Sequence, residues 1–293
     1  MKKSLVSLLA ATGLALTAGC SGNAPAAERS AEEKPVLKVA GTGVSYPHSF
    51  KEGDELVGFD TEVIEEAATR AGYEVEFSTM DFPGLLGAVN SGKIDTTATN
   101  LTWTEERAGL YVFSTAYAFD GVGLSVHEDD DTVTTLADLE GRTIAAGTGT
   151  TNLAAVEAWI EESGVDATIR PYDTAQSALQ DTLVRRVDAL ARPYGSAVAQ
   201  REKQGLELKP IGELLTFEQT RFPFADNERG RELAEDISAS LEEMLADGTL
   251  AGLSEKYFTY DRTVADERFA EPTPTELTLP EQYGDAPSAS PSN

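Results

Sequence analysis

Short apolar runs alternate with stretches of helical periodicity along most of the chain. Between the strand-like runs 37–43 and 73–79, apolar side chains line one face of a predicted helix: Val63, Ile64, Ala67, Ala68 and Ala71. Gly72 then favours a helix end. A short helix over 82–92 and a strand over 93–101 continue this alternation.

The same succession begins again in the second half. Strands are predicted over 141–149, 167–173 and 187–193, with helices over 150–164 and 175–186 between them. Near the end, an amphipathic helix is predicted by four regularly spaced apolar residues: Leu233, Ile237, Leu241 and Leu245. Strands that alternate with helices are typical of mainly parallel sheets, so two such series predict an α/β protein with two lobes.

The N-terminus has the features of an export signal. Lys2 and Lys3 precede an apolar run over 4–18, which is shorter than the ~20 residues that usually span a bilayer. Residues 16–20 resemble a bacterial lipoprotein box, although its leucine stands one place early. The resemblance implies a signal peptide over 1–19 and a lipidated Cys20, which would anchor the protein to a membrane. The alternatives are a retained apolar helix or a free cysteine in an ordinary signal peptide.

Two polar segments flank the predicted body, which extends from about 36 to 260. Residues 20–35 are small and polar, which predicts a flexible tether. Residues 261–293 are rich in Pro, Ser and Thr, which predicts a disordered polar tail.

The charge of the chain limits its partners. With 23 basic and 50 acidic residues, the formal net charge is -27, which repels nucleic acid and anionic lipid. The acidic balance either keeps an exported protein soluble or reflects adaptation to high salt.

Few residue patterns suggest catalysis or metal binding. His48 and His127 lack partners at metal-ligand spacing, and the chain has neither a GxSxG nor a GxxxxGK[ST] motif. We therefore expect no metal, no cofactor and no catalytic residues. The segment 147–152 follows a strand and begins a helix, so it predicts either an anion site at a helix N-terminus or simple capping by Thr150 or Thr151.

Five segments together resemble the bacterial family 3 solute-binding proteins, the polar amino acid receptors of ABC importers. They lie between Leu37 and Phe258 and read GTGVSYPHSFKEGDELVGFD, FPGLLGAVNSGKID, TNLTWTEER, GRTIAAGTGTTN and LADGTLAGLSEKYF. The resemblance implies a two-lobed, type 2 periplasmic-binding-protein-like fold, with a ligand cleft between lobes that two crossovers join. Lobe 1 would comprise 36–122 and 217–260, and lobe 2 would comprise 123–216.

The resemblance also implies roles for individual residues. Arg107 would bind the α-carboxylate of a ligand, helped by Thr99, Asn100 and Thr102. From the other lobe, Thr150 and Thr151 would offer backbone N–H groups to the same carboxylate. The side chains that would sandwich the body of the ligand are Tyr46 and Phe82. A planar guanidinium and a helix N-terminus both suit a carboxylate.

Two positions depart from the family. Gly43 and Pro193 stand where acids usually reach the ammonium group of the ligand. Other groups would have to face that cation: Asp120, Glu218, or the rings of Tyr46, Phe82 and Trp103. Arg192 and Arg221 would suit a second acidic group on the ligand. A distal carboxylate, a zwitterionic compatible solute or a disulfide-linked amino acid each fit these departures.

We therefore expect a non-enzymatic, monomeric binding lipoprotein of an ABC importer, exported and anchored to the outer face of the cell membrane. It would capture a small carboxylate-bearing solute, such as an amino acid or its derivative, and deliver it to a permease. Two alternatives are a dehydratase acting on a cyclic carboxylate and a sensor of the same ligand.

Overall fold

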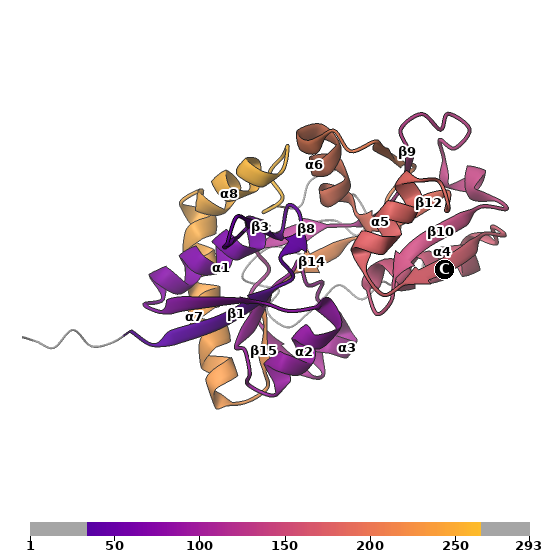
Figure 1. Cartoon of the computed structure of the whole chain (residues 1–293). Coiled ribbons are helices and arrows are strands. Elements are labelled where there is room, and N and C mark those ends of the chain that lie inside the picture. The colour runs from indigo at the N-terminus through magenta and orange to yellow at the C-terminus, as the bar shows by residue number, and fades with distance from the viewer. Residues whose placement is uncertain (1–33, 265–293) are drawn as a thin grey trace, which may run out of the picture. The chain divides into compact units, whose positions relative to one another are not determined.

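The computed structural model describes residues 34–264 (Figure 1). The predicted signal peptide, Cys20 and most of the predicted tether and tail lie outside the described residues. Lobe 1 is formed first by β1 (Val36–Gly41), β2 (Val44–Ser45), β3 (Ser49–Glu52), β4 (Glu55–Val57), α1 (Phe59–Arg70), β5 (Glu74–Thr79), α2 (Phe82–Asn90), β6 (Thr96–Ala98), α3 (Glu105–Ala108), β7 (Tyr111–Phe113) and β8 (Ala118–Asp120). The chain later returns to lobe 1 with β14 (Glu218–Thr220), β15 (Pro223–Ala225), α7 (Glu228–Ala246) and α8 (Thr249–Tyr257).

Lobe 2 lies between these two stretches in the sequence. Its elements are β9 (Val122–His127), the 3₁₀ helix η1 (Leu136–Leu139), β10 (Thr143–Gly147), α4 (Thr151–Ser163), β11 (Thr168–Tyr172), α5 (Ala175–Leu183), β12 (Ala189–Pro193), α6 (Tyr194–Gln204) and β13 (Leu208–Ile211).

The central sheet of lobe 1 is parallel, as the alternating pattern predicts. β1 lies between β5 and β6, and Val39 pairs with Phe77 on one side and Thr96 on the other. The helices α1, α7 and α8 pack against one another beside this sheet (Figure 1). The predicted apolar face of α1 is confirmed from Val63 to Ala68, while Ala71 is the C-cap and Gly72 follows with a φ of +87°.

The sheet of lobe 2 has a mixed order, β11-β10-β12-β9-β13. The three predicted strands β10, β11 and β12 are parallel, whereas β9 and β13 pair antiparallel at one side. Each lobe has its own apolar core: Phe59, Ile64 and Phe222 belong to the core of lobe 1, and Leu124 and Ile144 belong to that of lobe 2.

The two crossovers between the lobes lie side by side. β8 and β14 pair antiparallel, with Asp120 opposite Glu218. Beyond them, a Cβ atom on Gly121 would lie 2.3 Å from the carbonyl oxygen of Thr216, so only glycine permits this approach. The chain therefore passes between the lobes through one narrow, backbone-paired region.

Residues 261–263, which the sequence analysis places in the polar tail, lie against the folded body. The side chain of Arg262 is fully buried, and its Nη2 lies 2.7 Å from Oδ2 of Asp120. Its Nε donates to the carbonyl of Phe119, and its guanidinium carbon lies 4.3 Å from the centre of the Phe258 ring. Arg262, near the end of the described residues, therefore supplies the positive charge that balances the buried carboxylate of Asp120.

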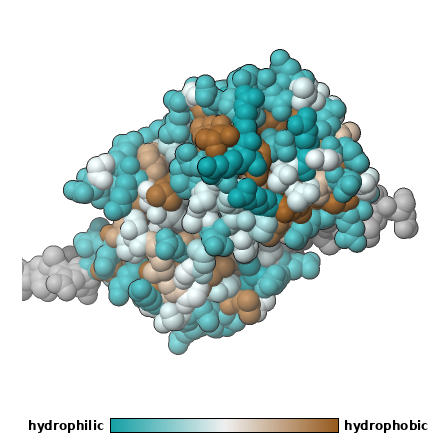
Figure 2. Space-filling view, turned by 45° about the vertical axis from the view of Figure 1, so that its right-hand side comes forward, coloured by the Kyte–Doolittle hydropathy of each residue, from teal (hydrophilic) through white to brown (hydrophobic). Residues whose placement is uncertain are grey.

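The surface visible in Figure 2 is mainly hydrophilic, with separate small apolar areas. Among residues 34–264, no helix combines the length and apolar character needed to cross a bilayer.

We predict that Arg262→Ala lowers the free energy of unfolding by about 3 to 5 kcal/mol, because it leaves the Asp120 carboxylate buried without its partner. Urea unfolding at neutral pH measures this change. Arg231→Ala is a matched control, since Arg231 pairs with Asp226 at an exposed site, where such pairs contribute about 0 to 1 kcal/mol. Equal effects of the two substitutions would contradict the prediction.

Candidate functional site

A cavity of about 290 Å³ lies between the lobes. All eight residues that the sequence analysis places at a ligand line it: Tyr46, Phe82, Thr99, Asn100, Thr102, Arg107, Thr150 and Thr151. Of the further candidates, Arg192 and Glu218 also line the cavity. Its described lining does not include Trp103, Asp120 or Arg221.

The end of β6 shapes the lobe 1 wall. Asn100 has a φ of +51°, a left-handed conformation that asparagine tolerates better than most residues. Its backbone N–H donates to Asp60, and its Oδ1 accepts from the hydroxyl of Thr220 at 3.1 Å. Because both groups are engaged within the protein, Asn100 fixes the course of the chain between Thr99 and Thr102.

Arg107 lies on the short helix α3, which begins after Thr104. The hydroxyl of Thr104 accepts from the N–H of Arg107, and Nη1 of Arg107 donates to the carbonyl of Thr102 at 2.7 Å. Burial lowers the pKa of Arg107, while the carboxylate of Glu218 opposes that shift. An arginine nevertheless remains charged at neutral pH, and its five N–H donors leave several available for an anion.

Glu218 lies beside this arginine at the crossover. Its Oε2 accepts from the hydroxyl of Thr102 at 2.8 Å, and the side chain is only 8% exposed. The hydroxyl of Thr151 donates to that of Thr102 at 3.4 Å and so extends the network to lobe 2. Burial raises the pKa of Glu218, and this effect outweighs the hydrogen bonds and the attraction of Arg107.

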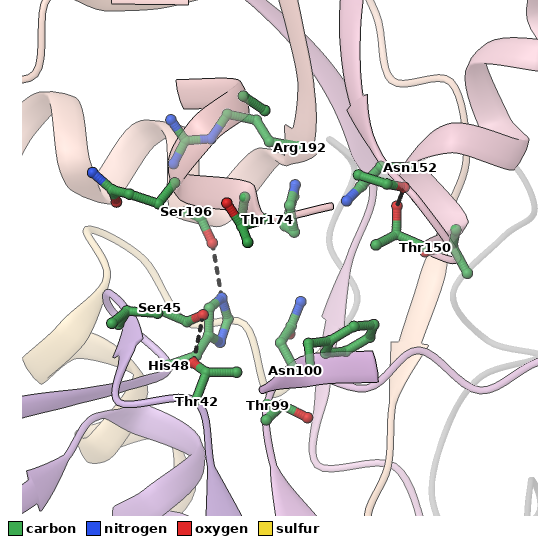
Figure 3. Close-up of a pocket in the computed structure, with 18 of the residues that line it drawn as sticks. Thr42, Ser45, His48, Thr99, Asn100, Thr150, Asn152, Thr174, Arg192 and Ser196 are labelled. Carbon is green, nitrogen blue, oxygen red and sulfur yellow. Dashed lines mark hydrogen bonds between the residues drawn. The ribbon is translucent and has the colours of Figure 1, made fainter. Parts of the chain in front are cut away.

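The lobe 2 wall contains the N-terminus of α4. Thr150 is the N-cap: its hydroxyl accepts from the N–H of Leu153 and donates to the carbonyl of Gly147. The helix that follows is 13 residues long, so its dipole favours negative charge at this end. Thr150 and Asn152 lie on one wall of the cavity, and Thr99 and Asn100 lie on the facing wall (Figure 3).

Two side chains of α6, those of Ser196 and Gln200, form hydrogen bonds with lobe 1. Nε2 of His48 lies 2.8 Å from the hydroxyl of Ser196 on α6, as Figure 3 shows. One helical turn further on, Nε2 of Gln200 donates to the carbonyl of Tyr46 at 3.1 Å. Nδ1 of His48 in turn faces the buried carboxylate of Asp60 at 3.4 Å. The first two bonds connect α6 of lobe 2 directly to lobe 1.

Sequence reasoning considers His48 only as a metal ligand and assigns no role to Ser196 or Gln200. The four-residue spacing of Ser196 and Gln200 predicts a common helix face, but nothing local indicates which lobe that face meets. Among the described residues, no group of His, Cys, Asp and Glu could hold a metal ion.

The three candidates outside the lining support the base of the cleft. Asp120 pairs with Arg262 and accepts from the N–H of Gly195 at 3.0 Å. The guanidinium carbon of Arg221 lies 5.6 Å from the ring centre of Trp103, and its Nε donates to Gln219 at 2.9 Å.

Gly43 and Pro193, which the sequence analysis expects to differ from the family pattern, carry backbone constraints of their own. Gly43 has a φ of +73°, and a Cβ atom there would lie 3.0 Å from a methyl group of Thr79. Pro193 ends β12, lines the cavity and precedes α6. Neither residue supplies a carboxylate to a bound cation.

Comparison with known proteins identifies close similarities over most of the chain. The sequence model of the bacterial extracellular solute-binding proteins, family 3, matches residues 37–260. The probable amino-acid-binding protein YxeM of Bacillus subtilis (strain 168) is 36% identical over 264 residues, which cover 90% of this chain and 98% of YxeM. The L-cystine-binding protein TcyJ of Escherichia coli (strain K12) is 30% identical, over 87% of this chain and 96% of TcyJ.

A solved structure shares the fold. The structure of an ancestral arginine-binding protein bound to arginine superimposes with a TM-score of 0.69 at 31% identity, over 77% of this chain and 99% of that protein. The two-lobed architecture of residues 34–264 is therefore that of known amino-acid-binding proteins.

We predict that Glu218→Gln raises the free energy of unfolding at pH 7. Because the folded state binds the Glu218 proton more tightly than the unfolded chain, the ionised carboxylate costs stability above its folded-state pKa. Glutamine removes that cost and can still accept from Thr102. The gain should disappear below the ordinary pKa of 4.5, where the wild-type group is protonated in both states. Urea unfolding of both proteins across this range measures the difference, and a loss of stability at pH 7 would contradict it.

Proposed function

Because the chain belongs to the bacterial extracellular solute-binding proteins of family 3, we propose that it captures an amino acid or amino acid derivative by the carboxylate and delivers it to an ABC permease. The observation that carries this proposal is that Arg107 of lobe 1 and the N-terminus of α4 of lobe 2 line the same cavity.

A carboxylate in this cavity would meet complementary groups from both lobes. Arg107 supplies a planar guanidinium that suits bidentate binding of a carboxylate. Thr99 and Thr102 lie on the same wall, and the first turn of α4, from Thr151, supplies N–H donors on the other. Tyr46 and Phe82 line the cavity as well and provide aromatic surface for the rest of the ligand.

Closure follows from the division of these groups between the lobes. A ligand first binds to Arg107 on lobe 1 and gains the donors of α4 only when lobe 2 approaches. The contacts of His48 with Ser196 and of Gln200 with Tyr46 join the same two lobes and would add to the stability of the closed state. Ligand binding and closure are therefore coupled, and the closed form is the one that a permease would recognise.

The proposed activity is binding without turnover. A dehydratase on this scaffold would need an acid over the ligand, and Asp120 is engaged by Arg262. Glu218 does line the cavity, but it accepts a hydrogen bond from Thr102 close to the proposed carboxylate site. The known relatives, moreover, are named as binding proteins.

We further propose that the exported protein is a lipoprotein that acts as a monomer at the outer face of the cell membrane. The lipobox-like segment before Cys20 supports the anchor, and a ligand site built from the two lobes of one chain needs no second copy. Diacylation together with N-acylation would hold the protein far more firmly than one acyl chain.

We predict that Arg107→Gln weakens the binding of an amino acid at least about a hundredfold, because it removes two charge-assisted hydrogen bonds. Calorimetric titration with L-cystine, L-arginine, L-glutamine and L-glutamate measures this loss. Arg231→Gln, at an exposed ion pair, is the control and should bind as the wild type does. Ligand recovered after binding should be chemically unchanged. Retained micromolar affinity in Arg107→Gln would refute the carboxylate role.

We predict that Cys20→Ala moves the exported protein from the membrane fraction to the soluble fraction in a bacterial host that processes lipoproteins. Fractionation followed by immunoblotting measures this change. The neighbouring substitution Ser21→Ala should leave the protein in the membrane fraction. Persistent attachment of Cys20→Ala would count against lipidation.

A further inference from the structure

One face of α6, a helix of lobe 2, contacts lobe 1. Ser196 and Gln200 form the hydrogen bonds described above, and Ala199 between them is fully buried in the apolar core of lobe 1. Near the end of the helix, Nζ of Lys203 donates to the carbonyl of Lys256 at 2.7 Å, so α6 lies close to α8 (Figure 1). These four residues of α6 share one helix face, because they are three or four positions apart.

Gly195 begins this face and lies against Arg262. It is the buried second residue of α6, and its N–H donates to Oδ1 of Asp120 at 3.0 Å. A Cβ atom on Gly195 would lie 3.1 Å from both Cδ and Nε of Arg262 and 3.2 Å from Oδ2 of Asp120. Carbon atoms in relaxed contact are about 3.5 to 4.0 Å apart. The start of α6 therefore packs directly on the ion pair of Asp120 and Arg262, with no room for a larger residue.

The position of Arg262 is fixed by lobe 1 and by the crossover. Its N–H donates to the hydroxyl of Ser254 on α8 at 2.8 Å, and its carbonyl accepts from the N–H of Phe119 on β8 at 2.8 Å. Its Nε donates to the carbonyl of Phe119 at 3.2 Å. The salt bridge with Asp120 adds to these bonds. Arg262 thus presents a well-held surface to α6.

Arg262 also contacts a residue of the lobe 1 wall of the cavity. Its Nη2 donates to Oδ1 of Asn100 at 3.4 Å, and Asn100 lines the cavity. Arg262 itself is not among the described lining residues. One buried side chain behind the cavity therefore contacts Asn100 of lobe 1 and Gly195 of lobe 2. The family match ends at residue 260, so family membership does not imply this contact.

We propose that Arg262 is a positioning residue for ligand capture, which holds the start of α6 against lobe 1 and so stabilises the arrangement in which both lobes line one cavity. The inference rests on the proposed function, in which the ligand contacts both lobes. Arg262 acts without touching the ligand. The apparent affinity falls in proportion to the fraction of molecules in the binding arrangement, so a weaker contact between Arg262 and α6 weakens binding.

The substitution Gly195→Ala tests this contact, because it adds one methyl group and removes no side chain. Overpacking displaces the start of α6 or Arg262. Gly195 lies beside the crossover, where the N–H of Tyr194 donates to the carbonyl of Gly121 at 2.9 Å. A displacement there changes the direction of the whole helix and moves Gln200 relative to lobe 1. Alanine is the better helix former, so helix propensity alone predicts no loss.

We predict that Gly195→Ala weakens ligand binding about tenfold or more, mainly through faster dissociation. The probe is whichever of L-cystine, L-arginine, L-glutamine and L-glutamate binds the wild-type exported chain most tightly. Calorimetric titration measures the affinity, and stopped-flow measurement gives the dissociation rate.

The distance between the lobes provides a readout that a purely structural role would not change. Nitroxide labels on Glu157→Cys of α4 and Glu235→Cys of α7, both exposed positions, report this distance by pulsed electron paramagnetic resonance. A Cys20→Ala background removes the one natural cysteine. The wild type should populate a short distance that the probe enriches, and Gly195→Ala should shift the population to longer distances.

Two further variants complete the test. Gly252→Ala in α8 is the matched control, since a Cβ atom there would meet no heavy atom within 4 Å, and it should keep the affinity and the distances. Arg262→Lys keeps a charge for Asp120 but cannot bond both Phe119 and Asn100 as the guanidinium does, so its loss of affinity should be measurable.

Thermal unfolding shows which variants fold. If only one of Gly195→Ala and Arg262→Lys folds, that variant decides; if neither folds, Arg262 serves the fold and the inference falls. A folded Gly195→Ala with the affinity and the distances of the wild type overturns the inference. The proposed function fails separately: if the wild type binds none of the four amino acids, ligand capture falls, while the distances without ligand still decide whether Arg262 positions α6.

Discussion

The architecture between the lobes depends on which acids, amides and aromatic rings pair with its buried guanidinium groups. Arg192, Arg221 and Arg262 are buried and Arg107 is partly buried, all near the crossovers or the cleft. Burying a cation without a counter-charge costs several kcal/mol. Arg262 is satisfied by Asp120, and Arg221 is held by Gln219 and the ring of Trp103. Arg107, which lines the cavity, makes fewer contacts within the protein, and this is the basis for the carboxylate site proposed above.

The need for a partner to Arg262 also connects the crossovers to the contacts between the lobes. Asp120 receives Arg262 and the N–H of Gly195, so one carboxylate ties the end of the described chain, β8 and the start of α6 together. From α6, Ser196 and Gln200 reach across to lobe 1. The position of Arg192 is in turn fixed by Gln200. The helix that contacts lobe 1 is thus also the one that orients Arg192 in the wall of the cavity.

Periodicity in the sequence predicts the elements with strong local patterns. The apolar face of α1, the helix α7 and the parallel strands β10, β11 and β12 follow from spacing alone. It does not predict β9, β13 or the paired strands of the crossovers, which are short or depend on partners distant in sequence. Arg262 illustrates the limit: a charged residue in a polar, proline-containing context is expected to be exposed, and only Asp120, far away in sequence, explains its burial. The cavity lining was predictable because several motifs resemble one family, whereas that resemblance assigns no contact between the lobes to His48, Ser196 or Gln200.

The proposed carboxylate site lies in a strongly acidic protein, so long-range and short-range electrostatics would act on the ligand in opposite directions. The chain has 50 acidic and 23 basic residues, so an approaching anion is repelled by the surface as a whole. Salt screens that field within about 8 to 10 Å at moderate ionic strength. A carboxylate bound to Arg107 would instead interact over hydrogen-bond distance, where partial burial reduces screening and strengthens the contact. Net charge would therefore influence how fast an anionic ligand arrives, whereas the partly buried Arg107 would determine how tightly its carboxylate is held.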